Sequence, residues 1–273
     1  MNESIRNFWD QDSRSYDMFV EKGFSIKKER RSWQALFTES FGDKKMNILD
    51  TGCGPGIVSM QLADLGHDMT SVDFSEKMLE AAKKNAEQNN LKINFQYADA
   101  ECLPFEDASF DGVVSDYMLW TVPDPQLVMK EWFRVLRPGG TIAYVDGNWT
   151  SDPKRTPFNC TMSKLGIFLD SPKKYLMNKK NKHTNTNMND LWSFKAMRPS
   201  DDITMMENAG FTNITVIHNI QDRVLHGIRH LAYGSTEDHF MIVAHKQPYT
   251  QNISENINDT LVSTASKIVF KTE

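Results

Sequence analysis

The sequence is poor in cysteine and has no long apolar run. Its three cysteines, Cys53, Cys102 and Cys160, are odd in number and widely separated along 273 residues. That arrangement excludes a disulfide framework and gives no zinc-ligand spacing, so we expect a reducing, cytoplasmic location. No apolar stretch approaches the roughly 20 residues of a membrane span, and we expect no signal peptide and no membrane span.

The chain also lacks a charge excess that would attract a polyanion. Its formal net charge is −5 and its pI is about 5.8. These values argue against broad electrostatic binding to DNA or RNA, and we expect no nucleic-acid partner. With 40% hydrophobic and 25% charged residues, the chain can form a sizeable core without covalent staples.

The most informative feature present is a glycine-rich stretch that follows a short apolar run. Residues 47–56 read Asn-Ile-Leu-Asp-Thr-Gly-Cys-Gly-Pro-Gly, so Gly52, Gly54 and Gly56 alternate after Asp50. Such a turn lets a ligand lie against bare backbone, and the next helix directs unpaired N–H groups to the same place. A glycine-rich turn by itself is a weak signal, and the downstream pattern decides its meaning.

Apolar strands and amphipathic helices alternate regularly from residue 46 onward. We predict parallel strands over 46–50, 69–73, 93–98, 110–115 and 141–146, with helices between them, and two further strands at 212–218 and 239–245. Arg137-Pro138-Gly139-Gly140 is predicted to stop the helix before the fifth strand. The alternation is typical of an α/β, doubly wound Rossmann-like sheet.

Acidic residues close the first three predicted strands, and this sheet edge is where doubly wound folds bind ligands. Asp50, Asp73 and Asp99 occupy these positions. Asp73 is placed to accept hydrogen bonds from two ribose hydroxyls, and Asp99 to accept from an exocyclic amine. Phe74 and Met78 are placed to enclose a flat base. Each residue alone also fits a turn, a cap or the core, and the ligand interpretation depends on the set.

Five motifs together resemble the class I S-adenosylmethionine-dependent methyltransferases, most closely the small-molecule subgroup that includes quinone-biosynthesis C-methyltransferases. They lie at residues 48–56, 72–79, 98–105, 110–114 and 134–140, and the resemblance is dense over 46–146. It implies a seven-stranded sheet in the order 3-2-1-4-5-7-6 with the last strand antiparallel. It also implies S-adenosyl-L-methionine as cofactor, S-adenosyl-L-homocysteine as product, and methyl transfer to a small molecule.

The resemblance also implies roles for residues outside the strand-end acids. Gly52 and Gly54 would hold the methionine part of the cofactor, and the Ala100 backbone would contact the adenine. The Ser115 backbone would face the cofactor's amino group. Tyr16 matches an N-terminal tyrosine that often closes over the cofactor.

The acceptor site is marked less clearly, and no catalytic residue is identified. Methyl transfer from a sulfonium needs mainly positioning, so the lack of a catalytic triad is no objection. The Asn-Pro-Pro-Tyr-type signature of enzymes that methylate base amines is also missing after strand four. Candidates for the pocket follow strands four and five: Tyr117 (with Asp116 before it), Trp120 and Trp149. The two tryptophans are equally compatible with the core.

His226 and His230 are spaced as i and i+4, a spacing that metal ligands use on a helix. No third ligand follows nearby and Gly227 weakens a helix there, so we expect no metal. A base, a substrate contact and a packed or solvated histidine all remain open for these two side chains.

The remaining segments set the expected domain boundaries. Residues 1–45 are predicted to form an N-terminal helical lid, and residues 46–246 the methyltransferase domain. Two irregular insertions, 147–199 and 221–236, would cap the active site, and the polar tail 247–273 would be flexible. We expect a monomer or homodimer.

Two other functions stay open at this point. A non-catalytic cofactor-binding module would share the same motifs. A nicotinamide-dependent oxidoreductase would share the fold, but its glycines follow a G-x-G-x-x-G spacing, whereas here they alternate.

Overall fold

The computed structural model describes residues 3–148, 157–170, 191–234, 239–248 and 269–271. The helices over these residues are α1 Glu3–Ser25, α2 Lys27–Phe41, α3 Ile57–Asp64, α4 Glu76–Gln88, α5 Pro125–Val135, α6 Pro157–Asp170, α8 Ser200–Ala209, α9 Ile220–Val224 and α10 Gly227–Tyr233. The strands are β1 Asn47–Thr51, β2 Asp68–Asp73, β3 Asn94–Tyr97, β4 Phe110–Asp116, β5 Leu136–Gly147, β6 Thr212–Ile217, β7 His239–His245 and β8 Val269–Lys271. Short 3₁₀ turns are η1 Leu119–Thr121 and η3 Trp192–Phe194.

The strands form one mixed sheet in the order β3-β2-β1-β4-β5-β7-β6-β8. The first five strands pair in parallel, and β7 runs antiparallel to both β5 and β6. The predicted order 3-2-1-4-5-7-6 with an antiparallel last strand is therefore confirmed. Because the order reverses between β1 and β4, the ends of these strands flank a crevice suited to a ligand.

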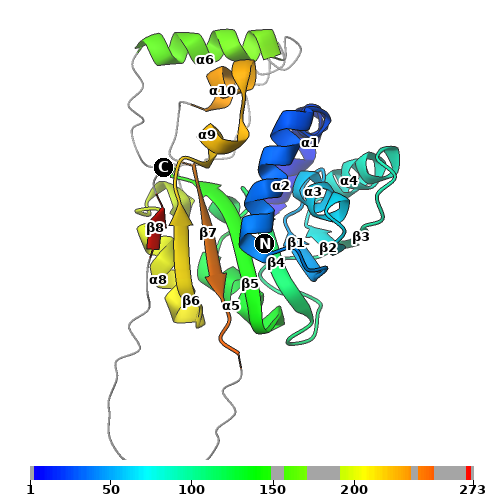
Figure 1. The fold of residues 1–273 in the computed structure, drawn as a ribbon, viewed down its shortest axis with the longest axis vertical. Helices are drawn as coiled ribbons and strands as arrows, with labels where there is room; N and C mark the ends of the chain where they lie inside the picture. The colour runs from blue at the N-terminus through cyan, green and yellow to red at the C-terminus, as the bar shows by residue number, and fades with distance from the viewer. Residues whose placement is uncertain (1–2, 149–156, 171–190, 235–238, 249–268, 272–273) are drawn as a thin grey trace, which may run out of the picture.

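Helices cover both faces of the sheet, and each face has its own core (Figure 1). One core joins α5 and α8 to the sheet and is centred on Trp132, which is fully buried. The indole N–H of Trp132 donates to Thr51 Oγ1 at 2.9 Å, so the helix is fixed directly to the strand that precedes the glycine turn. The other core joins α2, α3 and α9 to the opposite face.

The sequence forms the early helices for local reasons. Ser75 caps α4 by accepting from the Met78 N–H, and Asp124 caps α5 by accepting from the Leu127 N–H, with Pro125 at the first helical position. Gly210, in the left-handed region with φ +103°, ends α8. These three signals were all visible in the sequence.

Three predictions about the segments differ from the structure. The stretch 137–140 belongs to β5, which begins at Leu136 directly after α5. The strand extends because Gly139 donates to the Lys246 carbonyl and Lys246 donates to the Gly140 carbonyl, so pairing with the chain after β7 continues. The predicted helix stop is thus a strand start.

The segment 221–236, predicted to be irregular, contains α9 and α10. The helices are five and seven residues long, too short for a periodic pattern to reveal. They depend on packing against distant segments, since isolated helices of this length are not stable.

The tail also contributes structure. Residues 269–271 form β8, parallel to β6, so the sheet has an eighth strand that the prediction lacked. The tail's residues 249–268, and the stretch 171–190 of the first insertion, lie outside the described residues.

The insertion helices α6, α9 and α10 lie at the end of the sheet toward which the β6 arrow points (Figure 1). This is also the end where the parallel strands finish, because β6 and β5 both run antiparallel to β7. α6 packs against α10 there, and Gly166 lies so close to Ala232 that a Cβ would meet its backbone nitrogen at 2.7 Å.

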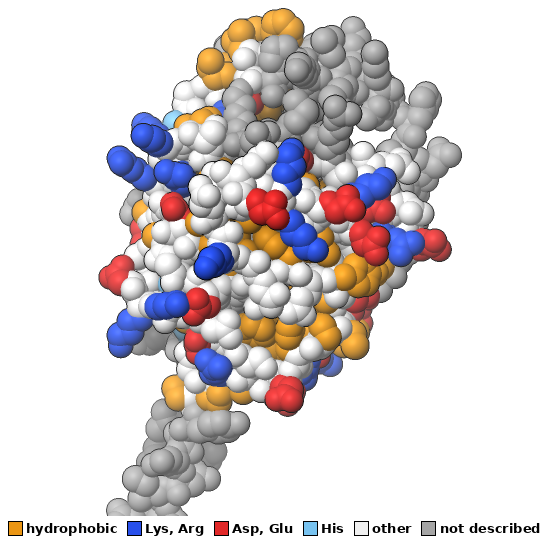
Figure 2. Space-filling model, turned by 90° about the vertical axis from the view of Figure 1, so that its right-hand side faces the viewer, with side chains coloured by type: hydrophobic (Ala, Val, Ile, Leu, Met, Phe, Trp, Pro, Cys, Tyr) orange, Lys and Arg blue, Asp and Glu red, His pale blue; other side chains and the backbone are white. Residues whose placement is uncertain are grey.

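The face that carries α4 and β3 shows acidic and basic side chains interspersed around apolar ones (Figure 2). None of the described helices combines the length and the apolarity needed to cross a bilayer.

Candidate active site

The glycine turn after β1 takes backbone conformations that only glycine adopts at low cost. Gly52, Gly54 and Gly56 have φ angles of +68°, +51° and +89°. A Cβ on Gly52 would lie 2.2 Å from Met118 Cγ, so that residue has no room for a side chain. Gly56 serves packing instead, because a Cβ there would lie 3.2 Å from the Ala82 Cβ, and its absence lets the start of α3 approach α4.

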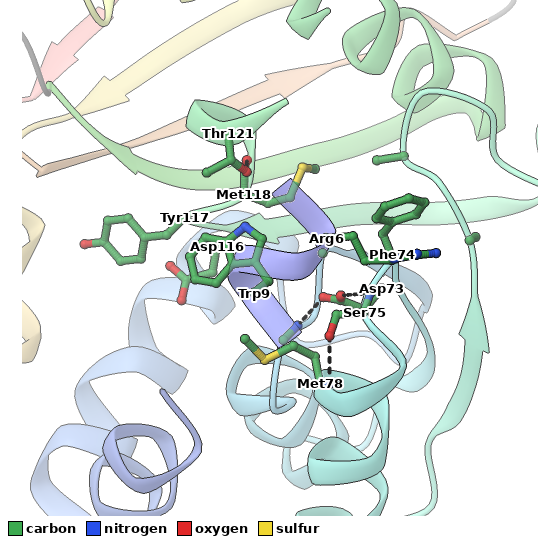
Figure 3. A pocket seen from close by; sticks show the side chains of 14 residues that line it. Arg6, Trp9, Asp73, Phe74, Ser75, Met78, Asp116, Tyr117, Met118 and Thr121 are labelled. Atoms are coloured by element: carbon green, nitrogen blue, oxygen red, sulfur yellow. Dashed lines mark hydrogen bonds between the residues drawn. The ribbon is translucent and has the colours of Figure 1, made fainter. Parts of the chain in front are cut away.

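Asp73, at the end of β2, is hydrogen-bonded to the glycine turn. Its Oδ2 accepts from the Gly54 N–H at 2.8 Å, and its Oδ1 accepts from the Ser75 N–H at 2.8 Å (Figure 3). Burial raises the pKa of Asp73 to about 6, while these backbone hydrogen bonds act in the opposite direction and Asp10 raises it further. Each oxygen keeps lone-pair capacity for a further donor.

The pocket that contains Asp73 lies at the ends of β1, β2 and β4. It is lined by Arg6, Trp9, Gly52, Gly54, Asp73, Phe74, Ser75, Met78, Ala98, Ala100, Asp116, Tyr117, Met118 and Thr121. Six of the predicted cofactor residues are among them: Gly52, Gly54, Asp73, Phe74, Met78 and Ala100. Asp99 lies between two lining residues and is hydrogen-bonded through Oδ1 to the Glu101 N–H. The sequence thus placed the strand-end residues of β1 and β2 near one another.

Helix α1 contributes two lining residues that sequence reasoning did not name for the site, Arg6 and Trp9. The Arg6 guanidinium lies 5.8 Å from the centre of the Phe74 ring. The helix is held to the β2 end because Ser75 Oγ donates to Asp10. Asn85 Nδ2 of α4 donates to Asp17 at 2.7 Å, about two helical turns after Asp10. The cluster of aromatic and charged residues in 1–20 was a visible signal, but not one that pointed to the pocket.

The third wall comes from the end of β4 and the turn after it. Tyr117 has φ +49°, a rare conformation for a bulky residue, and the reversal brings Asp116, Tyr117 and Met118 into the same pocket. The Tyr117 hydroxyl lies 2.8 Å from His239 Nδ1. Burial lowers the pKa of His239 to about 4, so the imidazole is neutral at pH 7.

Several predicted residues do not line this pocket. Asp50 is 1% exposed behind the turn, where its carboxylate accepts from Ser59 Oγ. Burial raises its pKa to about 7, with Asp73 adding to the effect. Ser115 is also buried and donates through Oγ to the Thr51 carbonyl at 2.7 Å. Trp120 donates to the Tyr117 carbonyl and lies beside Trp9 and Phe194.

The two histidines lie away from the pocket and have separate partners. His226 Nε2 lies 3.0 Å from Ser32 Oγ, and His230 Nε2 lies 2.8 Å from Asp222 Oδ1. His226 precedes α10 and His230 lies within it, so they do not share a helical face. No group of three or more His, Cys, Asp or Glu side chains among the described residues is placed to hold a metal.

For two predicted residues, the described part of the structure includes no side chain. Trp149 lies outside the described residues, and Tyr16 is described only through the backbone of α1.

The part of the chain that matches known proteins includes the glycine turn after β1. Residues 49–144 match the Methyltransferase domain family. The chain is 40% identical over 101 residues to a ubiquinone biosynthesis O-methyltransferase of Coxiella burnetii. The aligned residues cover 37% of this chain and 43% of the relative. It is 39% identical over 131 residues to a demethylmenaquinone methyltransferase of Lactococcus lactis, covering 46% of this chain and 51% of the relative.

The fold has solved counterparts as well. Phosphoethanolamine N-methyltransferase 2 of Haemonchus contortus, in complex with S-adenosyl-L-methionine, superposes with a TM-score of 0.58 at 18% identity, covering 89% of this chain and 60% of that chain. Residues 49–144 therefore match a methyltransferase domain, the chain shares its fold with this solved methyltransferase, and the predicted resemblance is confirmed for these residues. The chain spans about half the length of the curated relatives it matches.

Proposed function

We propose that the chain is an S-adenosylmethionine-dependent methyltransferase that acts on a small-molecule acceptor. The observation that carries the proposal is the 2.8 Å hydrogen bond from the Gly54 N–H to Asp73 Oδ2. It joins the glycine-rich turn to an acid at the end of the neighbouring strand, and both line one pocket. Cofactors of this shape need such a pair, because one end is a charged amino acid and the other a ribose.

The residues present fit this cofactor. Gly52 and Gly54 line the pocket, so the methionine part would lie against this turn, and Asp73 keeps acceptor capacity for ribose hydroxyls. Phe74 and Met78 supply apolar surface for the base, with the backbone of Ala98–Ala100 beside them. In this proposal Asp50 and Ser115 act from behind the turn by fixing β1, and Gly56 acts by letting α3 approach α4.

The bound cofactor supplies a methyl group on a positively charged sulfur, which an acceptor displaces in line. The chain's part is to hold the two reactants and exclude water, and orientation alone can lower such a barrier by about 7–11 kcal/mol. Trp9 and Arg6 suit that role because they line the pocket from α1. We propose that residues 1–45 act as a lid and that the 147–199 and 221–236 insertions cap the acceptor side.

The test is calorimetry with S-adenosyl-L-methionine and S-adenosyl-L-homocysteine. We expect micromolar binding of both. Asp73→Ala should weaken binding by about 1–3 kcal/mol, the cost of leaving donors without a charged acceptor. The matched control is Asp68→Ala, at the exposed start of the same strand, which should bind as the unaltered protein does. Absence of binding to either compound would refute the proposal.

The other two functions give different results in the same preparation. A non-catalytic module would bind the cofactor and transfer labelled methyl to no metabolite fraction. A nicotinamide-dependent oxidoreductase would change the fluorescence of reduced nicotinamide cofactor on titration.

We also propose a cytoplasmic location and a monomeric or homodimeric state. The acidic pI and the odd, scattered cysteines support the location. Cell fractionation and light scattering after size-exclusion chromatography test these two points.

A further inference from the structure

One carboxylate oxygen in the candidate active site is buried without a hydrogen-bond partner. Among the described residues, the buried side-chain atoms without a hydrogen bond are Asp116 Oδ1, Asp50 Oδ1 and the two amide atoms of Gln61. Of these, only Asp116 lines the pocket, where the residue keeps partial exposure. A buried carboxylate without a partner is costly, so its presence at a ligand pocket needs an explanation.

The surroundings further disfavour the ionised form of this carboxyl group. Burial raises the pKa of Asp116 well above its ordinary value, and the nearby carboxyls of Asp50 and Asp146 raise it further. The nearby arginines have other partners. Arg198 pairs with Asp146 at 3.1 Å and with Asp202 at 2.6 Å. Arg6 lies over Phe74 and 3.5 Å from Glu3. A cationic ligand would offset the negative charge of these neighbouring carboxylates.

The position of Asp116 separates it from the cofactor-binding side. In Figure 3, Asp116 and Tyr117 lie on the other side of Trp9 from Asp73 and Phe74. The aromatic side chains of Trp9 and Tyr117 line the same pocket. Aromatic rings beside a carboxylate suit an ammonium group, because both attract a desolvated cation.

We propose that Asp116 binds the ammonium group of the acceptor, so that the substrate class is a small primary or secondary amine. This inference rests on the proposed methyltransferase function. We infer that the same carboxylate also acts as the general base of the reaction. An ammonium has no lone pair to react, and Asp116 accepts its proton, leaving the neutral amine as nucleophile. The protonated Asp116 then returns the proton to water after methyl transfer.

The key variant is Asp116→Asn, which keeps the shape of the side chain and removes the charge. Because Asp116 Oδ1 has no hydrogen-bond partner, this variant should melt no lower than the unaltered protein. The matched control is Asp111→Asn on the same strand, whose carboxylate pairs with Arg137 at the surface, outside the pocket. Calorimetry with S-adenosyl-L-homocysteine should give the same affinity, within about twofold, for the unaltered protein and both variants.

The acceptor is tested with methyl-labelled S-adenosyl-L-methionine and a metabolite extract separated into cationic, neutral and anionic fractions. We expect label in the cationic fraction, at least tenfold less with Asp116→Asn, and an unchanged amount with Asp111→Asn.

The remaining outcomes contradict the inference in distinguishable ways. If the unaltered protein binds no S-adenosyl-L-homocysteine, the proposed function fails and the inference fails with it. If it binds but labels a neutral or anionic fraction, or none, only the amine assignment is overturned. If Asp116→Asn weakens S-adenosyl-L-homocysteine binding tenfold or more, Asp116 serves the cofactor instead.

Discussion

At the scale of single residues, Asp73 shows how a strand end prepares a ligand site. Both of its oxygens accept backbone N–H groups, one from the glycine turn and one from the start of α4. These bonds fix the carboxylate before any ligand arrives. Fixed acceptors lose less entropy on binding than mobile ones, so this arrangement favours tight recognition of a diol.

The pKa of Asp73 predicts a pH dependence of cofactor binding. Burial raises it to about 6, and only the ionised form accepts two ribose hydroxyls well. Affinity should therefore be constant above about pH 7 and fall as pH drops through 6, by about tenfold at pH 5. Calorimetry with S-adenosyl-L-homocysteine between pH 5 and 8 measures this. Asp73→Asn should bind weakly at every pH without that step, and an unchanged step would assign the titration to another group.

At the scale of elements, the glycine turn is shaped as much by its neighbour as by itself. Met118, from the turn after β4, fills the space where a Gly52 side chain would project. The close approach ties the β1 and β4 ends together, and so fixes the distance between the two walls of the pocket.

This contact makes Gly52→Ala a sensitive substitution. The new methyl group would combine a positive φ with a clash against Met118 Cγ at 2.2 Å, and overpacking of this kind costs about 1–3 kcal/mol beyond the backbone strain. Gly66→Ala is the matched control, since Gly66 has φ +96° but nothing within 4 Å. It should cost about 1–2 kcal/mol from strain alone. Urea unfolding compares them, and equal losses would show that Met118 moves aside freely.

Buried charge joins β5 to α8 and to the residues that precede it. Arg198, before α8, pairs with Asp146 at the end of β5 and with Asp202 of α8, and both carboxylates are fully buried. Asp146 also accepts from the Trp120 N–H at 3.1 Å, so the network reaches the turn that follows Tyr117. The network thus positions one wall of the pocket from behind.

Removing the arginine should leave two buried acids without a cationic partner. Arg198→Met is therefore expected to lower the free energy of unfolding by about 3–5 kcal/mol. The control is Arg137→Met, which breaks a partly exposed pair with Asp111 and should cost about 1 kcal/mol or less. Urea denaturation followed by circular dichroism gives both values. A loss for Arg198→Met as small as the control's would mean that the acids protonate without cost.

At the scale of the whole molecule, a second buried cluster connects segments that are far apart in the sequence. Arg229 of α10 donates to Glu29 of α2 at 2.8 Å and lies 3.5 Å from Asp170 at the end of α6. It also closes against Gly23 of α1, where a Cβ would meet its Nη2 at 3.2 Å. The N-terminal helices and both insertions therefore meet at one residue.

Because α1 and the sheet both line the pocket, a bound ligand should stabilise the molecule as a whole. S-adenosyl-L-homocysteine at 100 times its dissociation constant adds about 2.7 kcal/mol, which corresponds to a rise of about 5–10 °C in melting temperature. Thermal unfolding with and without the compound measures the shift. Asp73→Asn should show a smaller rise at the same concentration, and no shift in the unaltered protein would contradict the site.

Much of the fold was predictable because its signals are local. The alternation of strands and helices, the caps at Ser75 and Asp124, and the glycine-rich turn each depend on residues within a few positions of one another. The start of β5 and the helices of 221–236 were missed, because pairing with Lys246 and packing against α2 decide them. These contacts span more than 100 residues.

The sequence by itself determined that strand ends carrying Gly54 and Asp73 meet, since parallel strands finish at one edge of a sheet. Only the tertiary structure decided that Trp9 and Arg6 line the same pocket, that Asp116 has no partner there, and that His226 lies 194 residues away in sequence from Ser32, the side chain it contacts. The physical reason is the range of the interactions. Backbone conformation and periodicity are properties of neighbouring residues, whereas the surroundings of a charge depend on every segment that packs around it.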